Sequence, residues 1–226
     1  MKAIAFVIVV TMLVIPLSQE KHKLNRDDWI YWQDDKPLTS QDYKGEVGDC
    51  GTEVIDDSVA VEAMACLAIW SVLDVPKNWK KGSKYEKFYF VPVFNTQKSW
   101  TKTNDSSAIL KQQVFFDMNE LSARWARREL YSLRKKTGNA TGTTANFYAT
   151  VEKQMQELKQ QMYTSYFNAV FRTNSLDNLQ SWVNFTTEML EGTEAYKTTE
   201  IEFERLFTEK PEKGYKKAKW ILGAMD

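Results

Sequence analysis

The spacing of apolar residues changes near the middle of the chain. Before residue 95 apolar residues alternate with polar ones or form continuous runs, a pattern typical of strands. Strands are predicted near 29–33, 58–75 and 85–95. After Ser106 apolar residues recur every three or four positions, which indicates amphipathic helices. This order predicts an α+β fold: an N-terminal antiparallel β-sheet packed by a long central helix and followed by a C-terminal helical region.

The helical half contains three strong segments and a weaker one. The first is predicted over 106–134, and the second over 147–170, where apolar residues recur through more than six turns. The third begins at a Ser and ends at a Gly over 175–192, both typical of helix ends. A tail helix is expected over 193–207, with a break at 210–214, where Pro and Gly interrupt the pattern.

Two local signals refine the strand half. Pro92 has no backbone N–H, so it predicts an edge strand or the end of regular pairing. Thr39 or Ser40 is a suitable N-cap for a single helical turn through Tyr43.

The N-terminus has the three-part pattern of a secretory signal. Lys2 precedes an apolar run over 3–17, which is short for a membrane span, and a polar stretch follows over 18–23. A signal peptide is therefore predicted over 1–20, with export to the periplasm or outside the cell. The alternative is an uncleaved anchor, which would make this segment the chain's only membrane contact.

Composition supports one globular domain. The 226 residues with 43% hydrophobic content permit one sizeable core, placed at 29–209 between a charged linker over 21–28 and a C-terminal tail over 210–226. Lys plus Arg and Asp plus Glu number 30 each, so no net positive field points to nucleic acid as a partner.

The chain has two cysteines, Cys50 in a polar turn and Cys66 inside an apolar run. In an exported protein they could form one disulfide. Alternatively, Cys66 is a small core residue and both thiols stay free. Their spacing does not decide between these alternatives.

The start of the predicted central helix has a spacing related to metalloprotease chemistry. A zincin helix carries His-Glu-x-x-His, because histidines four residues apart share one helix face and bind one Zn²⁺, while the Glu is the general base. In the best register Lys111 and Phe115 occupy the histidine positions and Gln112 occupies the glutamate position. The sequence therefore has the frame of this motif without its metal-binding residues.

The residues that follow give this register its support. The run Phe116-Asp117-Met118-Asn119-Glu120-Leu121-Ser122-Ala123-Arg124 resembles the segment His-Glu-Gln-x-His-Phe-Asp-Ile-x-Glu-x-x-Ala-Arg of a bacterial secreted family of unknown function. That family, number nine-two-two in its series, is described as predicted zinc-dependent proteases. The resemblance implies a zincin-like, metalloprotease-like domain.

Further segments between about residues 28 and 190 resemble the same family. The family's aspartate position after the conserved tyrosine is filled by Phe167, and its last histidine region corresponds to 172–175. The matching segments are Trp32 with Pro37-Leu38-Thr39, Asp42-Tyr43-Lys44-Gly45, Val93-Phe94-Asn95 with Ser99-Trp100, Tyr166, and Gln180-Ser181-Trp182.

The residues at the motif positions cannot perform zincin chemistry. The whole chain holds one histidine, His22, beside the expected cleavage site. A phenyl ring has no lone pair, a protonated ammonium does not coordinate, and an amide is no general base. Asp117 and Glu120 keep carboxylates on the same helix and could line a cleft or hold a hard cation. The simpler interpretation is that both accept hydrogen bonds from neighbouring groups.

These observations predict a pseudoenzyme: an exported zincin-like protein that is non-catalytic, has no cofactor or metal, and binds a peptide or protein partner. One alternative is an active secreted hydrolase or peptidase whose catalytic residues the sequence does not identify. A purely structural envelope protein is a third interpretation. No catalytic residue is assigned.

Overall fold

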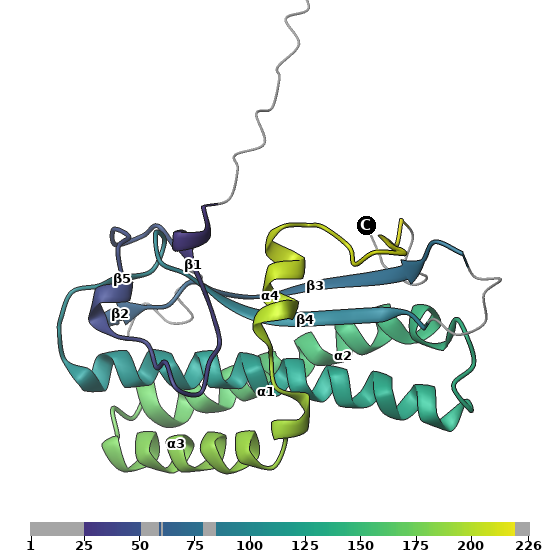
Figure 1. Cartoon of the computed structure of the whole chain (residues 1–226). Coiled ribbons are helices and arrows are strands. Elements are labelled where there is room, and N and C mark those ends of the chain that lie inside the picture. The colour runs from purple at the N-terminus through teal and green to yellow at the C-terminus, as the bar shows by residue number, and fades with distance from the viewer. Residues whose placement is uncertain (1–24, 51–58, 60, 79–84, 220–226) are drawn as a thin grey trace, which may run out of the picture.

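The computed structural model describes residues 25–50, 59, 61–78 and 85–219. In this part of the chain a four-stranded antiparallel sheet has the order β1-β4-β3-β6, and two short strands, β2 and β5, pair separately. The prediction of an α+β fold is confirmed (Figure 1). The elements are β1 (Trp29–Tyr31), β2 (Ala63–Met64), β3 (Leu67–Pro76), β4 (Lys87–Asn95), β5 (Trp100–Thr101), α1 (Ser106–Lys136), α2 (Thr143–Tyr166), α3 (Leu176–Glu191), α4 (Glu200–Phe207) and β6 (Tyr215–Lys217).

Helices cover both faces of the sheet. Figure 1 shows α1 and α2 running along one face, with α3 against α1, while α4 lies across the other face. The alternation of side chains along β4 explains this arrangement. Phe88 and Phe90 pack with the core on α1 and α2, whereas Val91 and Val93 pack with Phe203 of α4. The central strand is therefore apolar on both sides.

Side chains cap the starts of α1 and α3. Asp105 caps α1, accepting a hydrogen bond from the N–H of Ser107 at 3.0 Å. Ser175 caps α3 in the same way, and Gly192 follows its last residue. The second predicted helix starts earlier than expected and ends in a π-helical turn, Phe167–Phe171.

The strand predictions hold in outline. The stretch predicted as 58–75 contains β2 and β3, although 51–58 and residue 60 lie outside the described residues. Pro92 lies within the central strand β4, not at a sheet edge. Its carbonyl accepts a hydrogen bond from the N–H of Trp32 at 3.2 Å, one residue after β1 ends. The missing N–H of Pro92 therefore falls where pairing with β1 stops, whereas regular pairing with β3 continues through Pro92 to Lys87. Thr39 caps the expected short turn, a 3₁₀ helix over Ser40–Asp42.

The tail differs from the predicted continuous helix. A 3₁₀ turn over Glu194–Tyr196 is separated from α4 by an extended stretch at 197–199. The break is needed because the chain leaves the α3 layer and crosses the sheet edge to reach the opposite face. Thr199 and Glu202 then form a capping box that starts α4. Beyond residue 209, β6 pairs with β3, so part of the expected tail belongs to the sheet.

Arginines of α1 hold the edge that the chain crosses. Since β1 pairs only with residues 93–95, the earlier carbonyls of β4 have no strand partner on that side in the described part of the chain. Arg127 donates to the carbonyls of Phe90 in β4 and of Tyr196, and Arg134 donates to the carbonyl of Glu86, the residue before β4, at 2.7 Å. These guanidinium groups satisfy an edge that would otherwise invite further strands.

The expected signal peptide lies outside the described residues. None of the helices described is long and apolar enough to cross a membrane. Part of the expected linker is ordered, with Arg26–Asp28 forming a 3₁₀ turn before β1.

Candidate functional site

Phe115, at one histidine position of the zincin motif, lies inside an aromatic cluster. Its ring centre is 4.7 Å from that of Tyr163, 4.8 Å from that of Tyr166 and 5.8 Å from that of Phe171. The first two contacts are edge-to-face, the favourable geometry for aromatic pairs. The volume at this helix position is therefore filled by packed rings from α2 and the π-helical turn.

Lys111, at the other histidine position, faces the turn that leads into α3. Its Nζ lies 3.4 Å from Oδ1 of Asn174 and 5.6 Å from the ring centre of Phe171. The hydroxyl of Tyr166 donates to the carbonyl of Lys111 at 2.9 Å. Asn174 has a φ of 47°, a left-handed conformation that asparagine tolerates.

Asn174 belongs to the segment 172–175, which the family resemblance aligns with a histidine region. The structure thus brings the segment 172–175 against the face of α1 that carries Lys111. Both segments are places where the resemblance expects metal-site residues. A π-helical turn immediately precedes this segment, and such turns often occur at functional sites.

Gln112, at the general-base position, points elsewhere. Its side chain is buried, and Oε1 accepts a hydrogen bond from the backbone N–H of Ala65 at 3.0 Å. This bond ties α1 to the chain between β2 and β3. Gln112 therefore has a structural partner in place of a catalytic water.

Asp117 connects α1 to the N-terminal segment. Its Oδ1 accepts hydrogen bonds from Nε1 of Trp32 and from Nε2 of Gln113, both at 2.8 Å. Gln113 in turn accepts from the N–H of Leu38 at 2.8 Å. Desolvation raises the pKa of Asp117 to about 6, against the opposing effect of its two donors. The carboxyl group of Asp117 therefore joins α1 to the N-terminal segment that contains Trp32, and both stretches belong to the resemblance described above.

Glu120 is fully buried and fully partnered. It accepts from Nε of Arg124 at 2.8 Å and from the N–H and hydroxyl of Thr198 at 2.8 and 2.5 Å. Arg127 lies 3.7 Å away. Glu120 thus anchors the chain crossing before α4, and it is not among the residues that line the cleft described below. Asp117 and Glu120, although three residues apart, serve separate networks.

The remaining matched segments also meet near this half of α1. The N–H of Lys44 donates to the carbonyl of Thr96 at 2.9 Å, and that of Gly45 donates to the carbonyl of Ser99 at 2.8 Å. A Cβ on Gly45 would lie 2.7 Å from the carbonyl oxygen of Gln97, so only glycine permits this approach. On the opposite side Trp182 packs edge-on against Tyr166, with ring centres 5.4 Å apart.

The two cysteines are adjacent in space. The structure carries Cys50 and Cys66 as free thiols, each partly exposed, with a hydrogen bond between the two side chains. This hydrogen bond raises the pKa of Cys50 and, with the Lys98 ammonium as a smaller cause, lowers that of Cys66 to about 7.

No metal-binding cluster of three or more His, Cys, Asp or Glu side chains occurs among the described residues. At the motif positions themselves the available groups are an ammonium, an amide and a phenyl ring. This donor set does not fit catalytic zinc, which needs imidazole, thiolate or carboxylate ligands.

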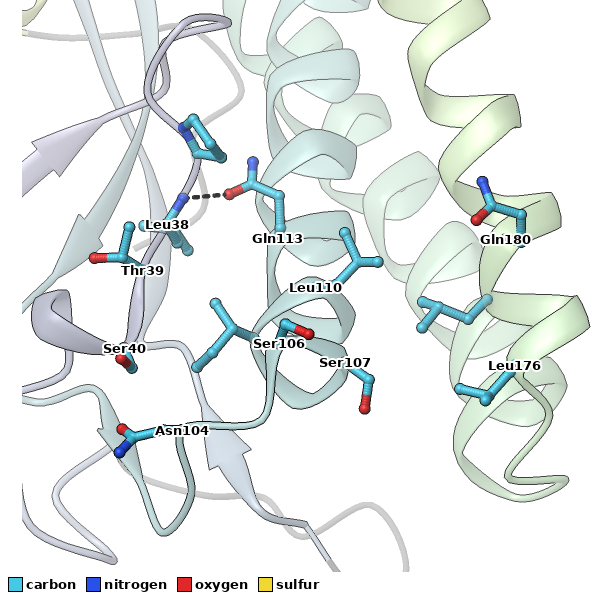
Figure 2. Close-up of a pocket in the computed structure, with 13 residues that line it drawn as sticks. Leu38, Thr39, Ser40, Asn104, Ser106, Ser107, Leu110, Gln113, Leu176 and Gln180 are labelled. Atoms are coloured by element: carbon cyan, nitrogen blue, oxygen red, sulfur yellow. Dashed lines mark hydrogen bonds between the residues drawn. The ribbon is translucent and has the colours of Figure 1, made fainter.

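An open cleft of about 550 Å³ lies beside the motif positions. Figure 2 shows Leu38, Thr39 and Ser40 along one wall, Leu176 and Gln180 of α3 along the other, and Leu110 with Gln113 of α1 between them. The lining carries no charged side chain. The full lining is Pro37, Leu38, Thr39, Ser40, Asn104, Ser106, Ser107, Ile109, Leu110, Gln113, Leu176, Leu179 and Gln180.

The cleft combines apolar surface with polar groups that have no internal partner. Leu110 is 37% exposed and Leu176 is 65% exposed. The side chains of Ser40, Asn104 and Ser106 make no hydrogen bond within the described part of the chain. Such a surface suits a neutral ligand with both apolar groups and hydrogen-bonding groups.

Sequence reasoning missed this cleft. Four of its apolar residues come from α1 and α3, where the sequence pattern assigns leucines and isoleucines to the core. Of the cleft residues only Pro37-Leu38-Thr39 and Gln180 belonged to matched family segments, and none was a candidate site residue. Asn174 was missed for another reason: a polar residue in a turn carries no signal of the lysine that it meets.

Comparison with protein-family models, with curated proteins and with solved structures finds no match to this chain.

Proposed function

We propose that this chain is an exported zincin-like protein with a degenerate metal site, which binds a neutral peptide segment of a partner without cleaving it. The observation that carries the proposal is the replacement at the motif positions. Lys111 and Phe115 are held by Asn174 and by an aromatic cluster, while an open, uncharged cleft lies one residue away at Leu110.

The non-catalytic part rests on chemistry. Lys111 is cationic at neutral pH, and Phe115 has no donor atom. The two carboxylates that follow the motif positions have other roles, since Asp117 binds Trp32 and Glu120 binds Arg124 and Thr198. None of them is positioned at the Lys111 and Phe115 face.

The binding part rests on the cleft. Its volume lies in the range of ordinary ligand sites, and two of its apolar residues, Leu110 and Leu176, remain exposed. The polar side chains around them offer hydrogen bonds to backbone amides, which every peptide carries. Since the lining has no charge, neutral peptides are favoured over acidic or basic ones.

Export is supported by the N-terminal pattern of Lys2, the apolar run over 3–17 and the polar stretch over 18–23. Mass spectrometry of the mature chain should find its N-terminus between about Gln19 and Lys23. Intact Met1 on soluble cytoplasmic protein would contradict export.

A peptide-display selection on the immobilised mature chain tests the binding function. Selected peptides should be neutral and should lose about tenfold in affinity, or about 1.4 kcal/mol, when Leu176→Glu places a charge in the cleft. Leu176 is exposed, so this variant should keep its fold. Ile201→Glu is the matched control, because Ile201 is 81% exposed on α4 and does not line the cleft.

Equal loss in both variants, or no binder that discriminates between them, would reject the cleft as the binding site.

The non-catalytic part of the proposal is tested separately. Purified protein should contain no stoichiometric zinc by elemental analysis, and any cleavage of casein should be insensitive to a chelator. Zinc in the wild type together with chelator-sensitive cleavage would overturn the proposal.

A further inference from the structure

Cys50 and Cys66 come from different segments of the chain and meet at its surface. A hydrogen bond joins their two thiols, and both side chains are partly exposed. Neither residue lines the cleft, and neither occupies a motif position. Reactive cysteines are partly exposed and lie near positive charge, whereas purely structural cysteines are buried and inert. The exposure of this pair therefore fits reaction with a sulfur from outside the chain.

Cys66 lies between β2 and β3, where its backbone is fixed on both sides. Its N–H donates to Oγ of Ser99 at 2.8 Å, and its carbonyl accepts from the N–H of Asn95 at 2.9 Å. Oγ of Ser99 in turn donates to the carbonyl of Asn95 at 2.6 Å. The turn over 95–99 therefore holds Cys66 in place.

The loop that carries Cys50 is attached to the same turn, through the backbone hydrogen bonds of Lys44 and Gly45 described above. Asp49, the residue before Cys50, also closes a local turn. Its carboxylate accepts from the N–H of Glu46 at 2.7 Å, and its own N–H donates to the carbonyl of Glu46 at 3.1 Å. Since hydrogen bonds already attach this loop, a permanent disulfide is not required to hold it there.

The surroundings make the two sulfurs chemically different. The hydrogen bond from Cys50 is the main cause that lowers the pKa of Cys66 to about 7, and the ammonium of Lys98 adds to it against the opposing effect of burial. The same hydrogen bond raises the pKa of Cys50. Because exchange between sulfurs proceeds through a thiolate, Cys66 is the nucleophile and Cys50 is its hydrogen-bond donor.

We propose that Cys50 and Cys66 form a thiol–disulfide exchange site, in which Cys66 bonds to a sulfur of an unhindered disulfide, of a small molecule or a peptide, and Cys50 then releases it. The site is separate from the peptide-binding cleft. It also differs from a structural disulfide, because its bond is made and broken in the folded protein.

The reaction begins with the reduced pair. The Cys66 thiolate attacks one sulfur of the substrate, the substrate S–S bond breaks, and the other sulfur leaves as a thiolate that takes up a proton. Cys50 then loses its proton and attacks Sγ of Cys66, which breaks the mixed disulfide and releases the second substrate sulfur as a thiol. Two electrons pass to the substrate, leaving two substrate thiols and a Cys50–Cys66 disulfide. The same steps in reverse return a disulfide to substrate thiols.

Trapping of the mixed disulfide tests these roles. Reduced full-length protein is mixed at pH 7 with oxidised glutathione or with a synthetic peptide closed by one disulfide, and intact mass is followed with time. Cys50→Ser should retain one substrate sulfur on Cys66. Cys66→Ser should react about fivefold more slowly, since the lower nucleophilicity of a more acidic thiolate offsets part of its greater abundance. The probe that reacts faster identifies the source of the substrate disulfide.

Alkylation of Cys66 by iodoacetamide at pH 7 gives an independent readout. Cys50→Ser keeps a hydroxyl that donates to the Cys66 sulfur, whereas Cys50→Ala removes the donor and should slow alkylation severalfold. Lys98→Gln should slow it by a smaller factor. Lys153→Gln is the matched control, because Lys153 pairs with Glu157 on α2.

Three results would each overturn the proposal. They are equal trapping on the two cysteines, alkylation of Cys66 that is unchanged by Cys50→Ala, and exchange with either probe that occurs only in denaturant. The last result would identify a purely structural bond.

Discussion

Glu120 of α1 accepts hydrogen bonds from both the backbone N–H and the hydroxyl of Thr198, 78 residues later in the sequence. The same carboxylate binds Arg124 at 2.8 Å, and Arg127 lies 3.7 Å from it. This buried group therefore joins the central helix to the point where the chain crosses the sheet edge. It is a structural anchor, although its position in the sequence marked it as a candidate cleft residue.

Replacing Glu120 by Gln should strongly destabilise the fold. The substitution removes the only fully buried negative charge that contacts Arg124 and Arg127, and leaves them the longer ion pairs to Glu194 at 3.7 Å and Glu202 at 3.9 Å. Breaking a buried ion pair typically costs about 3 to 5 kcal/mol. Urea denaturation measures the change in the free energy of unfolding. Glu157→Gln is the control, because its 4.0 Å ion pair with Lys153 is exposed and should contribute less than about 0.5 kcal/mol. Similar losses in both variants would show that Glu120 is no anchor.

Asp117 should make the stability of the protein depend on pH. Its pKa is about 6 in the folded chain and 3.8 in the reference state, so the folded state retains a proton that the unfolded state has released between these values. The free energy of unfolding therefore falls as pH rises from about 4 to about 6. The upper limit is about 3 kcal/mol, reduced by solvent screening of a partly exposed group.

Asp117→Asn removes this titration while keeping an oxygen that accepts from Trp32 and Gln113. The difference in unfolding free energy between wild type and variant, measured across this pH range, isolates the contribution of Asp117 from that of other groups. The variant should gain relative stability as pH rises. A difference that is constant with pH, or that runs in the opposite direction, would refute the raised pKa.

Restoring imidazoles should create a metal site if the ancestry is correct. Lys111→His and Phe115→His place two imidazole rings on one helix face. Asn174→His adds a third ring, because Oδ1 of Asn174 lies 3.4 Å from Nζ of Lys111. Gln112→Glu completes the motif. Calorimetric titration with Zn²⁺ should show stoichiometric binding by this variant.

The control for this graft keeps Lys111→His and Phe115→His but leaves Asn174 unchanged, and should bind zinc much more weakly. Equal affinity in the two variants would mean that the turn at 172–175 does not face the metal. No zinc binding by a variant with a native circular dichroism spectrum would argue against a shared origin.

Cys50 and Cys66 should form a disulfide in exported protein, because their thiols already form a hydrogen bond. Closing a loop of roughly 15 residues contributes on the order of 3 kcal/mol. Alkylation followed by mass spectrometry should find both thiols protected until a reductant is added. Cys50→Ser should leave one thiol that alkylates without reduction. Two alkylated cysteines in protein recovered from the native envelope would show that they stay reduced.

The sequence predicted the fold wherever local signals agree with packing. Ser175 caps the helix that it was expected to start, and Gly192 follows the end of α3. The prediction did not detect β6, whose three residues carry little pattern and depend on β3 for their structure. The break before α4 was missed because it results from crossing the sheet edge, although Thr199 and Glu202 carry a readable capping signal.

The candidate site was predicted less well. Helical spacing correctly placed Lys111 and Phe115 on one face, and no pattern along the chain indicates that Asn174 meets Lys111. Asp117 and Glu120 are neighbours in sequence, yet their partners Trp32 and Thr198 lie far away in both directions. Which donor reaches a carboxylate is decided by tertiary packing, which a single sequence does not report.

Different parts of the long helix α1 carry the motif positions and the contacts that stabilise the sheet. Its first turns carry the motif positions and part of the cleft lining. Farther along, Glu120 holds the crossing chain, while Arg127 and Arg134 bind the carbonyls of Phe90 in β4 and of Glu86 just before it. Changes limited to Lys111 and Phe115 therefore leave these three sets of contacts intact, whereas a change at Gln112 would also affect its hydrogen bond to Ala65. Substitutions at Lys111 and Phe115 could therefore accumulate during evolution while Glu120 and Arg127 continue to stabilise the fold.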